Sequence, residues 1–188
     1  MKSTCSLIFL FFLAGCTPST THTLKLQQLE RSHSPLPDTI ASISNLSSCT
    51  DSDEKTIQIN SAAPITVLVH GCNGSAGRFR SLAQLYAFHG QQAICFKYDD
   101  RDSLDDSAKQ LAISLGQLSN KHISILGHSM GGLIARKALE PDFGKYFKQS
   151  EQQLELITVS APFAGIDAAN HCGIRSWHWL SLGIVPSI

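Results

Sequence analysis

The stretch GHSMGG at residues 127–132 decides the fold of this chain. It follows a short apolar run at residues 123–126 and precedes an apolar pattern of helical period that Pro141 closes. The sequence therefore predicts a strand, a sharp turn and a helix in that order. Glycines two positions on either side of Ser129 let the chain reverse there without steric clash, and a serine held at such a turn is placed as a nucleophile.

Apolar strands alternate with helix-period segments along the chain. Strands are expected at residues 65–69, 93–98, 123–126 and 154–159, and helices from near residues 79, 103 and 129. This order predicts an α/β fold, a parallel sheet flanked by helices with right-handed crossovers. Active sites of such sheets lie at the carboxyl ends of the strands, where His70, Gly71 and Ser129 are found.

His70 and Gly71 directly after the first of these strands, together with the GHSMGG turn, resemble the α/β-hydrolase superfamily of the lipase and esterase kind. The resemblance covers roughly residues 60–170, including a segment at 157–165 that is similar to bacterial lipases and inositol deacylases. It implies an α/β-hydrolase-like sheet that lacks its last strands. It also implies a serine hydrolase that cleaves carboxylic esters through an acyl-enzyme on Ser129, with a small-molecule ester or lipid as substrate and no metal or organic cofactor.

The resemblance further implies roles for individual residues. Ser129 is the nucleophile, and the backbone N–H groups of Met130 and Cys72 form the oxyanion hole that binds the negative oxygen of the tetrahedral intermediate. His70 belongs to the oxyanion loop, and His128 is a neighbour of the serine that points away from it. Neither histidine is expected to be the base that activates Ser129.

An acid and then a histidine follow the serine in this superfamily. The downstream candidates are Asp142 and Asp167 for the acid, and His171 and His178 for the base. The chain ends at residue 188, which leaves too few residues after Val159 for two more strand-helix units, because one βαβ unit takes about 30 residues or more. We therefore expect the usual base to be absent and the chain to be a fragment of a longer hydrolase. A shortened site that uses Asp167 with His171 or His178 is the alternative.

Two other functions use the same features. A hydrolase scaffold without its acid and base would be a non-catalytic lipoprotein, and an acyltransferase would use the same serine with an alcohol in place of water.

The N-terminus has the pattern of a secretory signal. An apolar run at residues 7–14 follows Lys2 and is too short to span a bilayer as a helix. Leu-Ala-Gly-Cys at residues 13–16 resembles the lipobox of bacterial lipoproteins, which implies a signal peptide over residues 1–15 and a lipid-modified Cys16 that anchors the protein in a membrane. In bacterial lipoproteins an aspartate directly after the lipid-modified cysteine signals retention in the inner membrane. This chain has Thr17 at that position, so the resemblance implies the outer membrane, on its periplasmic side.

Residues 16–55 are rich in Ser, Thr and Pro and are predicted to be a tether. The resemblance implies that residues 56–188 are the partial α/β-hydrolase domain. Within the tether, Ile40, Ile43 and Leu46 recur at helical spacing, which indicates some packing on the domain.

Cysteine usage leaves the disulfide pairing open. One of the six cysteines leaves with the signal peptide and one takes lipid, so four remain in a compartment that permits disulfides: Cys49, Cys72, Cys95 and Cys172. Four cysteines allow three pairings. The pairs considered are Cys72 with Cys95 and Cys72 with Cys49, and Cys95 is alternatively a small buried apolar residue of its strand.

Composition excludes one class of partner. The chain has 188 residues, enough for one ordinary domain, and its 43% hydrophobic content is normal for a globular core. Its 15 basic residues equal its 15 acidic residues, and no basic stripe is present in the sequence. The electrostatic footprint of nucleic-acid binding is therefore missing.

Overall fold

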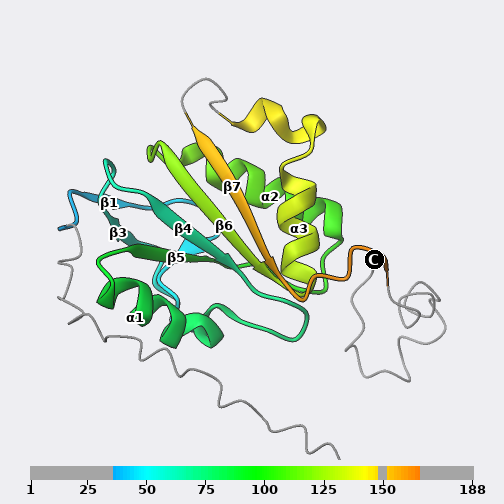
Figure 1. Cartoon of the computed structure of the whole chain (residues 1–188), viewed down its shortest axis with the longest axis horizontal. Helices are drawn as coiled ribbons and strands as arrows, with labels where there is room; N and C mark the ends of the chain where they lie inside the picture. The colour runs from blue at the N-terminus through cyan, green and yellow to red at the C-terminus, as the bar shows by residue number, and fades with distance from the viewer. Residues whose placement is uncertain (1–35, 148–151, 166–188) are drawn as a thin grey trace, which may run out of the picture. The chain divides into compact units, whose positions relative to one another are not determined.

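The computed structural model describes residues 36–147 and 152–165 of the chain (Figure 1). The predicted signal peptide, Cys16, Asp167, His171 and His178 lie outside the described residues. None of the helices among the described residues has the length and apolar character needed to cross a bilayer.

The elements begin with three short strands, β1 (Thr39–Ala41), β2 (Leu46–Ser47) and β3 (Ile57–Ile59). They continue with β4 (Ile65–Val69), the short 3-10 helix η1 (Ala76–Phe79), α1 (Arg80–Phe88), β5 (Gln92–Phe96) and α2 (Leu104–Gln117). The last are β6 (His122–His128), α3 (Met130–Ala138), the 3-10 helix η2 (Pro141–Tyr146) and β7 (Gln153–Val159).

The described strands form a five-stranded sheet in the order β2-β5-β4-β6-β7 and a separate two-stranded sheet of β1 and β3. In the larger sheet β5, β4, β6 and β7 are parallel, whereas β2 is antiparallel to β5. The predicted α/β fold is confirmed, with the correction that the sheet is mixed rather than wholly parallel. From β4 the chain moves to β5 on one side and then crosses to β6 on the other. At such a change of direction, ligands of open α/β sheets commonly bind near the carboxyl ends of the two strands, here β4 and β6.

Both faces of the central strand β4 are covered. Ile65, Val67 and Val69 pack in a core with α2 and α3, whereas Leu68 packs on the opposite face with residues of α1 (Figure 1). Successive side chains of a strand point to opposite faces, so a strand buried on both sides reads as a continuous apolar run. This is why residues 65–69 carry almost no polar side chain.

Local sequence determines where α2 begins and where α3 ends. The Ser103 hydroxyl accepts a hydrogen bond from the N–H of Asp106 at 3.1 Å, which caps the start of α2. Helix α3 ends at Ala138, shortly before Pro141, whose ring cannot continue a helix and which begins η2 instead.

The structure corrects the tether predicted over residues 16–55 for the part that it describes, residues 36–55. Strand β2 lies within that range, and its Leu46 pairs with Phe96 of β5 and is 2% exposed. Ile43 is also buried, whereas Ile40 is 73% exposed. The apparent helical spacing of these residues is therefore accidental. A two-residue strand has too little alternation to be recognised in a sequence, so its place depends on the partner strand.

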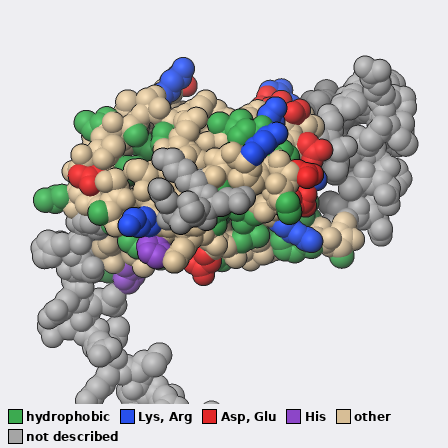
Figure 2. All heavy atoms as spheres, turned by 90° about the horizontal axis from the view of Figure 1, so that it is seen from above, with side chains coloured by type: hydrophobic (Ala, Val, Ile, Leu, Met, Phe, Trp, Pro, Cys, Tyr) green, Lys and Arg blue, Asp and Glu red, His purple; other side chains and the backbone are tan. Residues whose placement is uncertain are grey.

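Figure 2 shows how charged side chains are distributed on one face of the described residues. On the face seen in Figure 2, basic and acidic groups are interspersed and do not form a patch of one sign.

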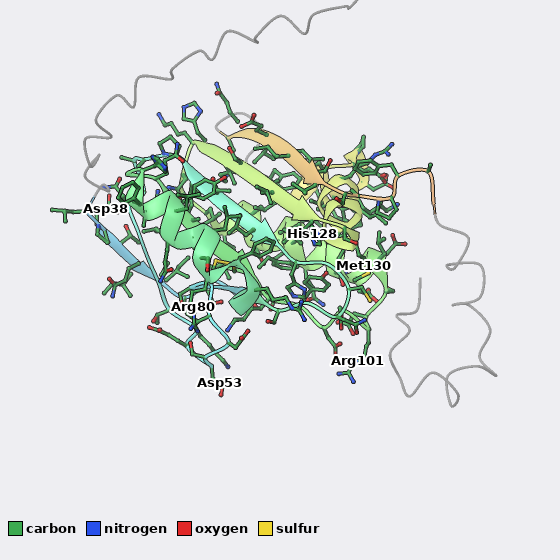
Figure 3. All side chains as sticks on the ribbon, turned by 60° about the horizontal axis from the view of Figure 1, so that its bottom comes forward. Asp38, Asp53, Arg80, Arg101, His128 and Met130 are labelled. Carbon is green, nitrogen blue, oxygen red and sulfur yellow. A yellow bond between two sulfur atoms is a disulfide. The ribbon has the colours of Figure 1, made fainter. Side chains whose placement is uncertain are left out.

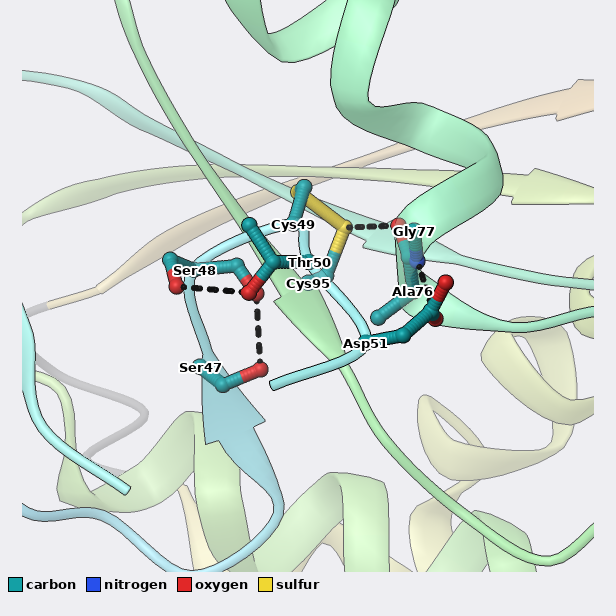
Figure 4. The surroundings of a disulfide bond; sticks show 8 residues. All are labelled: Ser47, Ser48, Cys49, Thr50, Asp51, Ala76, Gly77 and Cys95. Carbon is teal, nitrogen blue, oxygen red and sulfur yellow. Dashed lines mark hydrogen bonds between the residues drawn. A yellow bond between two sulfur atoms is a disulfide. The ribbon is translucent and has the colours of Figure 1, made fainter. Parts of the chain in front are cut away.

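A disulfide joins Cys49 to Cys95, and neither predicted pair with Cys72 is present (Figure 4). The pairing of β2 with β5 places Ser47 opposite Cys95. Cys49 follows Ser47 by two residues and is therefore close enough to bond with the Cys95 sulfur. Both sulfur-bearing residues are buried, and Cys95 is completely so. The carbonyl oxygen of Ala76 in η1 lies 3.6 Å from the Cys95 sulfur, so the disulfide also contacts the segment that follows β4.

Removal of this disulfide is expected to lower the stability of the fold. The crosslink spans 46 residues. In the chain-entropy model, closing a loop of this length raises the free energy of the unfolded chain by about 4 kcal/mol. We expect Cys49→Ser to lower the free energy of unfolding by an amount of this order, measured by urea denaturation. Cys72→Ser, which leaves the disulfide intact, is the control. Equal stability of Cys49→Ser and the wild type would contradict the prediction.

Candidate active site

Ser129 connects β6 to α3 in a backbone conformation that residues other than glycine rarely adopt, with φ 54° and ψ −124°. Its N–H donates to the carbonyl oxygen of Val159 at 2.9 Å, and its own carbonyl oxygen accepts from the N–H of Gly132 at 2.9 Å. These bonds hold the turn between the end of β7 and the first turn of α3. The side chain is partly exposed. The predicted order of strand, turn and helix is therefore present, with the serine at its bend.

Close approach of two backbones accounts for the glycine at position 131. An ideal Cβ on Gly131 would overlap the carbonyl oxygens of Val69 and His70 at the end of β4. Any side chain at this position would push the N-terminus of α3 away from the central strand. Residue 131 must therefore be glycine for the turn to lie against β4.

The loop after β4 lies against the serine. An ideal Cβ on Gly71 would come within 2.9 Å of the Ser129 Cβ and 3.0 Å of the His128 carbonyl oxygen. Cys72 follows Gly71 in the loop and is exposed. The structure thus brings Ser129 and the loop that contains Cys72 to one edge of the sheet.

Met130 is the first residue of α3, directly after the serine, and Figure 3 shows it beside His128 at the carboxyl end of β6. The first N–H groups of a helix have no partner within the helix, and they lie at the positive end of its dipole. The N–H of Met130 therefore belongs to a part of the helix that favours negative charge.

His70 is held by the loop and by a neighbouring ring. Its side chain is 5% exposed, its Nδ1 lies 3.0 Å from the carbonyl oxygen of Gly71, and its ring stacks on that of Tyr98 with 4.3 Å between centroids. Burial lowers the pKa of His70, which favours the neutral ring. These contacts are those of a residue that shapes the loop, the role expected for it.

Two contacts from the segment after β5 were missed by sequence reasoning. The hydroxyl of Tyr98 donates to the carbonyl oxygen of His70 at 2.6 Å, and the carboxylate of Asp100 accepts from the N–H of Asn73. In the sequence these residues belong only to an apolar strand end and an acidic turn. No local pattern there indicates contact with a loop nearly thirty residues earlier.

A cavity of about 270 Å³ lies against this loop and is lined by His70, Gly71, Cys72, Gly74, Arg78, Phe79 and His128. A larger cavity of about 700 Å³ is lined by residues of the segments 42–47 and 53–55 and by Lys97, and no residue of the loop or of the serine turn contributes to it. The smaller cavity is therefore the one adjacent to the candidate chemistry.

The structure separates Asp142 from the serine. Asp142 is exposed in η2, which follows α3. Because α3 runs back antiparallel to β6, its C-terminus and η2 lie at the opposite edge of the sheet from Ser129 (Figure 1). Asp142 is thus excluded as the acid.

Among the described residues, no group of three or more His, Cys, Asp or Glu side chains is arranged to hold a metal ion.

Burial of His70 predicts a pH dependence of stability. Because its folded pKa is below the ordinary value of 6.5, the unfolded chain binds a proton that the folded chain does not. The stability contributed by the neutral ring is therefore present above pH 6.5 and is lost as the pH falls toward the folded pKa. We expect His70→Asn to lose less stability than the wild type between pH 7.5 and pH 5.5, measured by urea denaturation. His89→Asn, at an exposed position, is the control, and equal losses in wild type and His70→Asn would count against this origin.

Solved lipase structures share the fold of this chain. Mature lipase BlEst2 of Bacillus licheniformis aligns with a TM-score of 0.51 and 22% identity, over 68% of this chain and 53% of the lipase. Its propeptide form aligns with a TM-score of 0.50 and 23% identity, over 65% of this chain and 27% of that chain. At this identity the likeness shows the α/β-hydrolase fold alone. The chain spans about half the length of the mature lipase.

Sequence comparison adds the family. The uncharacterized protein YJR098C of Saccharomyces cerevisiae is 50% identical over 50 residues, which cover 24% of this chain and 8% of the yeast protein. The model of the family described as "Putative serine esterase (DUF676)" matches residues 60–184, about two thirds of the chain. That range contains the loop after β4, the serine turn and every strand of the parallel part of the sheet. The chain belongs to this serine esterase family, DUF676.

Proposed function

We propose that this protein hydrolyses carboxylic esters with Ser129 as its nucleophile. The observation that carries the proposal is the left-handed backbone of Ser129 at the junction of β6 and α3, with its side chain against Gly71. A serine in this position projects at the carboxyl edge of the sheet, where a substrate has access. Membership of the esterase family and the lipase-like fold support the same chemistry.

The reaction would proceed through an acyl-enzyme. Ser129 Oγ attacks the acyl carbonyl carbon and forms a new C–O bond, while its proton passes to a base. The ester C–O bond then breaks, and the alcohol leaves after it takes up that proton. A water molecule attacks the acyl-enzyme in the same way, which releases the carboxylic acid and returns the proton to Ser129.

The negative oxygen of each tetrahedral intermediate would be bound by the backbone N–H groups of Met130 and Cys72. Removal of one such donor typically lowers kcat by about 10²- to 10³-fold. Because the donors belong to the main chain, replacement of either side chain leaves the N–H in place.

The base and acid of this mechanism remain proposals from the sequence. His70 is engaged by Gly71 and Tyr98, so it is unsuited to accept the serine proton. The alternative named from the sequence, with Asp167 as acid and His171 or His178 as base, lies outside the described residues.

The substrate would be a small-molecule ester or a lipid. The cavity against the loop has a volume of about 270 Å³, and Phe79 and the glycines of the loop give it an apolar component. Such a cavity suits the acyl or alcohol part of an ester.

The proposed nucleophile is tested with a fluorophosphonate probe, which forms a covalent bond with activated serines. We expect the wild type to be labelled and to hydrolyse p-nitrophenyl esters, and we expect Ser129→Ala to lose both activities. Ser160→Ala is the matched control, because Ser160 also has a positive φ, 55°, and follows the carboxyl end of the neighbouring strand. Labelling that persists in Ser129→Ala, or a folded wild type that is neither labelled nor active, would overturn the proposal and favour a non-catalytic scaffold.

We also propose that Cys16 carries lipid and anchors the protein in the outer membrane, facing the periplasm. The lipobox-like residues 13–16 support the anchor. The disulfide between Cys49 and Cys95 is in keeping with an oxidising compartment such as the periplasm.

The anchor is tested by metabolic labelling with radioactive palmitate in a bacterial host. We expect the wild type to incorporate label and to fractionate with the outer membrane, and we expect globomycin to cause the precursor to accumulate. Cys16→Ser should incorporate no label, whereas Cys72→Ser should behave as the wild type does. Equal labelling of Cys16→Ser and wild type would refute the anchor.

A further inference from the structure

The loop after β4 is held at its first residue by Tyr98. The Tyr98 hydroxyl donates to the carbonyl oxygen of His70 at 2.6 Å, and the two rings stack with an angle of 15° between their planes. Burial raises the pKa of Tyr98, so the hydroxyl keeps the proton that it donates. One residue thus fixes both the backbone and the side chain at the start of the loop.

Asp100 holds the tip of the same loop. Its carboxylate accepts a hydrogen bond from the N–H of Asn73, a residue in the left-handed region with φ 54°. The N–H of Gly74 donates to the carbonyl oxygen of Gly71 at 3.1 Å, which closes the turn around these residues. The Asn73 N–H donates and the carboxylate accepts, so the side chain of Asp100 fixes the backbone at the tip of the loop.

Cys72 lies between these two points of attachment. Residue 70 is fixed on one side and residue 73 on the other, so the peptide between Gly71 and Cys72 has little freedom to rotate. Hydrogen bonds weaken steeply as the donor turns away from the acceptor. A rotation of this peptide would therefore remove the Cys72 N–H from an oxyanion on Ser129 without any change in the residues that contact the substrate.

We propose that Tyr98 and Asp100 are positioning residues that aim the Cys72 N–H at the oxyanion of the ester hydrolysis reaction. The inference rests on the proposed function of Ser129. Both residues act from the segment that follows β5, and both act on the main chain of the loop. Asp100 acts as a hydrogen-bond acceptor, and its negative charge is not needed for this role. A negative charge near the developing oxyanion would instead oppose formation of that oxyanion.

The matched variants follow from this division of roles. Asp100→Ala removes the acceptor, whereas Asp100→Asn keeps an acceptor oxygen and removes the charge. Tyr98→Phe removes only the hydroxyl and keeps the ring that stacks on His70. Asp102→Ala is the control, since Asp102 is exposed in the same acidic turn and its side chain has no part in the proposal.

The measurement is the rate of phosphonylation by an alkyl fluorophosphonate, resolved into a maximal rate constant and an apparent dissociation constant. The phosphoryl oxygen of the probe occupies the oxyanion hole as it reacts, so the rate constant reports the aim of the donors. We expect it to fall about 10- to 100-fold in Asp100→Ala and in Tyr98→Phe, with the dissociation constant unchanged. Asp100→Asn and Asp102→Ala should react within about threefold of the wild type, on the scale of one well-placed donor.

The outcomes separate this inference from the function on which it rests. If wild-type labelling does not depend on Ser129, the proposed function is overturned and this inference with it. If labelling depends on Ser129 but Asp100→Ala and Tyr98→Phe react at the wild-type rate, the inference alone is overturned. It is also overturned if Asp100→Asn is as slow as Asp100→Ala, or if Asp102→Ala is equally slow. Thermal unfolding of each variant is recorded alongside, and Tyr98→Phe decides the test if Asp100→Ala does not fold.

Discussion

The N-terminus of α3 approaches the end of β4 closely enough for backbone to lie on backbone. Glycine at position 131 permits this, since a Cβ there would overlap the carbonyl oxygens of Val69 and His70. The left-handed backbone of Ser129 turns the chain into that approach, and two hydrogen bonds of 2.9 Å hold it. If the helix stood farther from the strand, the loop after β4 would no longer lie against the serine. The candidate site depends on this contact before any side chain is considered.

The loop after β4 depends in turn on two segments that carry no catalytic group. The segment after β5 holds it through Tyr98 and Asp100. On the other side, Asp51 accepts a hydrogen bond from the N–H of Gly77 at 2.9 Å, and its own pKa is lowered by hydrogen bonds from Ser75 and Gly77. Asp51 follows the disulfide-linked Cys49 by two residues. The N-terminal segment, expected from its composition to be a tether, therefore contributes to the architecture around the loop.

This arrangement separates chemistry from support. The proposed nucleophile and oxyanion donors lie at the turn around Ser129 and in the loop after β4, where small residues allow the two backbones to approach closely. The groups that hold them come from strand ends and from the disulfide region, where burial and hydrogen bonds restrain the backbone. A site built in this way tolerates changes of the Cys72 or Met130 side chain more readily than changes in the groups that orient their N–H groups.

The sequence by itself determined the alternation of strands and helices, the turn at Ser129 and the place of the β4 loop at the carboxyl edge. These features depend on neighbouring residues, through apolar periodicity and through the steric freedom of glycine, so they can be read from short windows. Only the tertiary structure decided the antiparallel addition of β2, the pairing of Cys49 with Cys95, the exclusion of Asp142 and the contacts of Tyr98 and Asp100. Each of these depends on which strand lies beside which, and strand order follows from the packing of segments that are tens of residues apart. Local patterns contain no record of that packing.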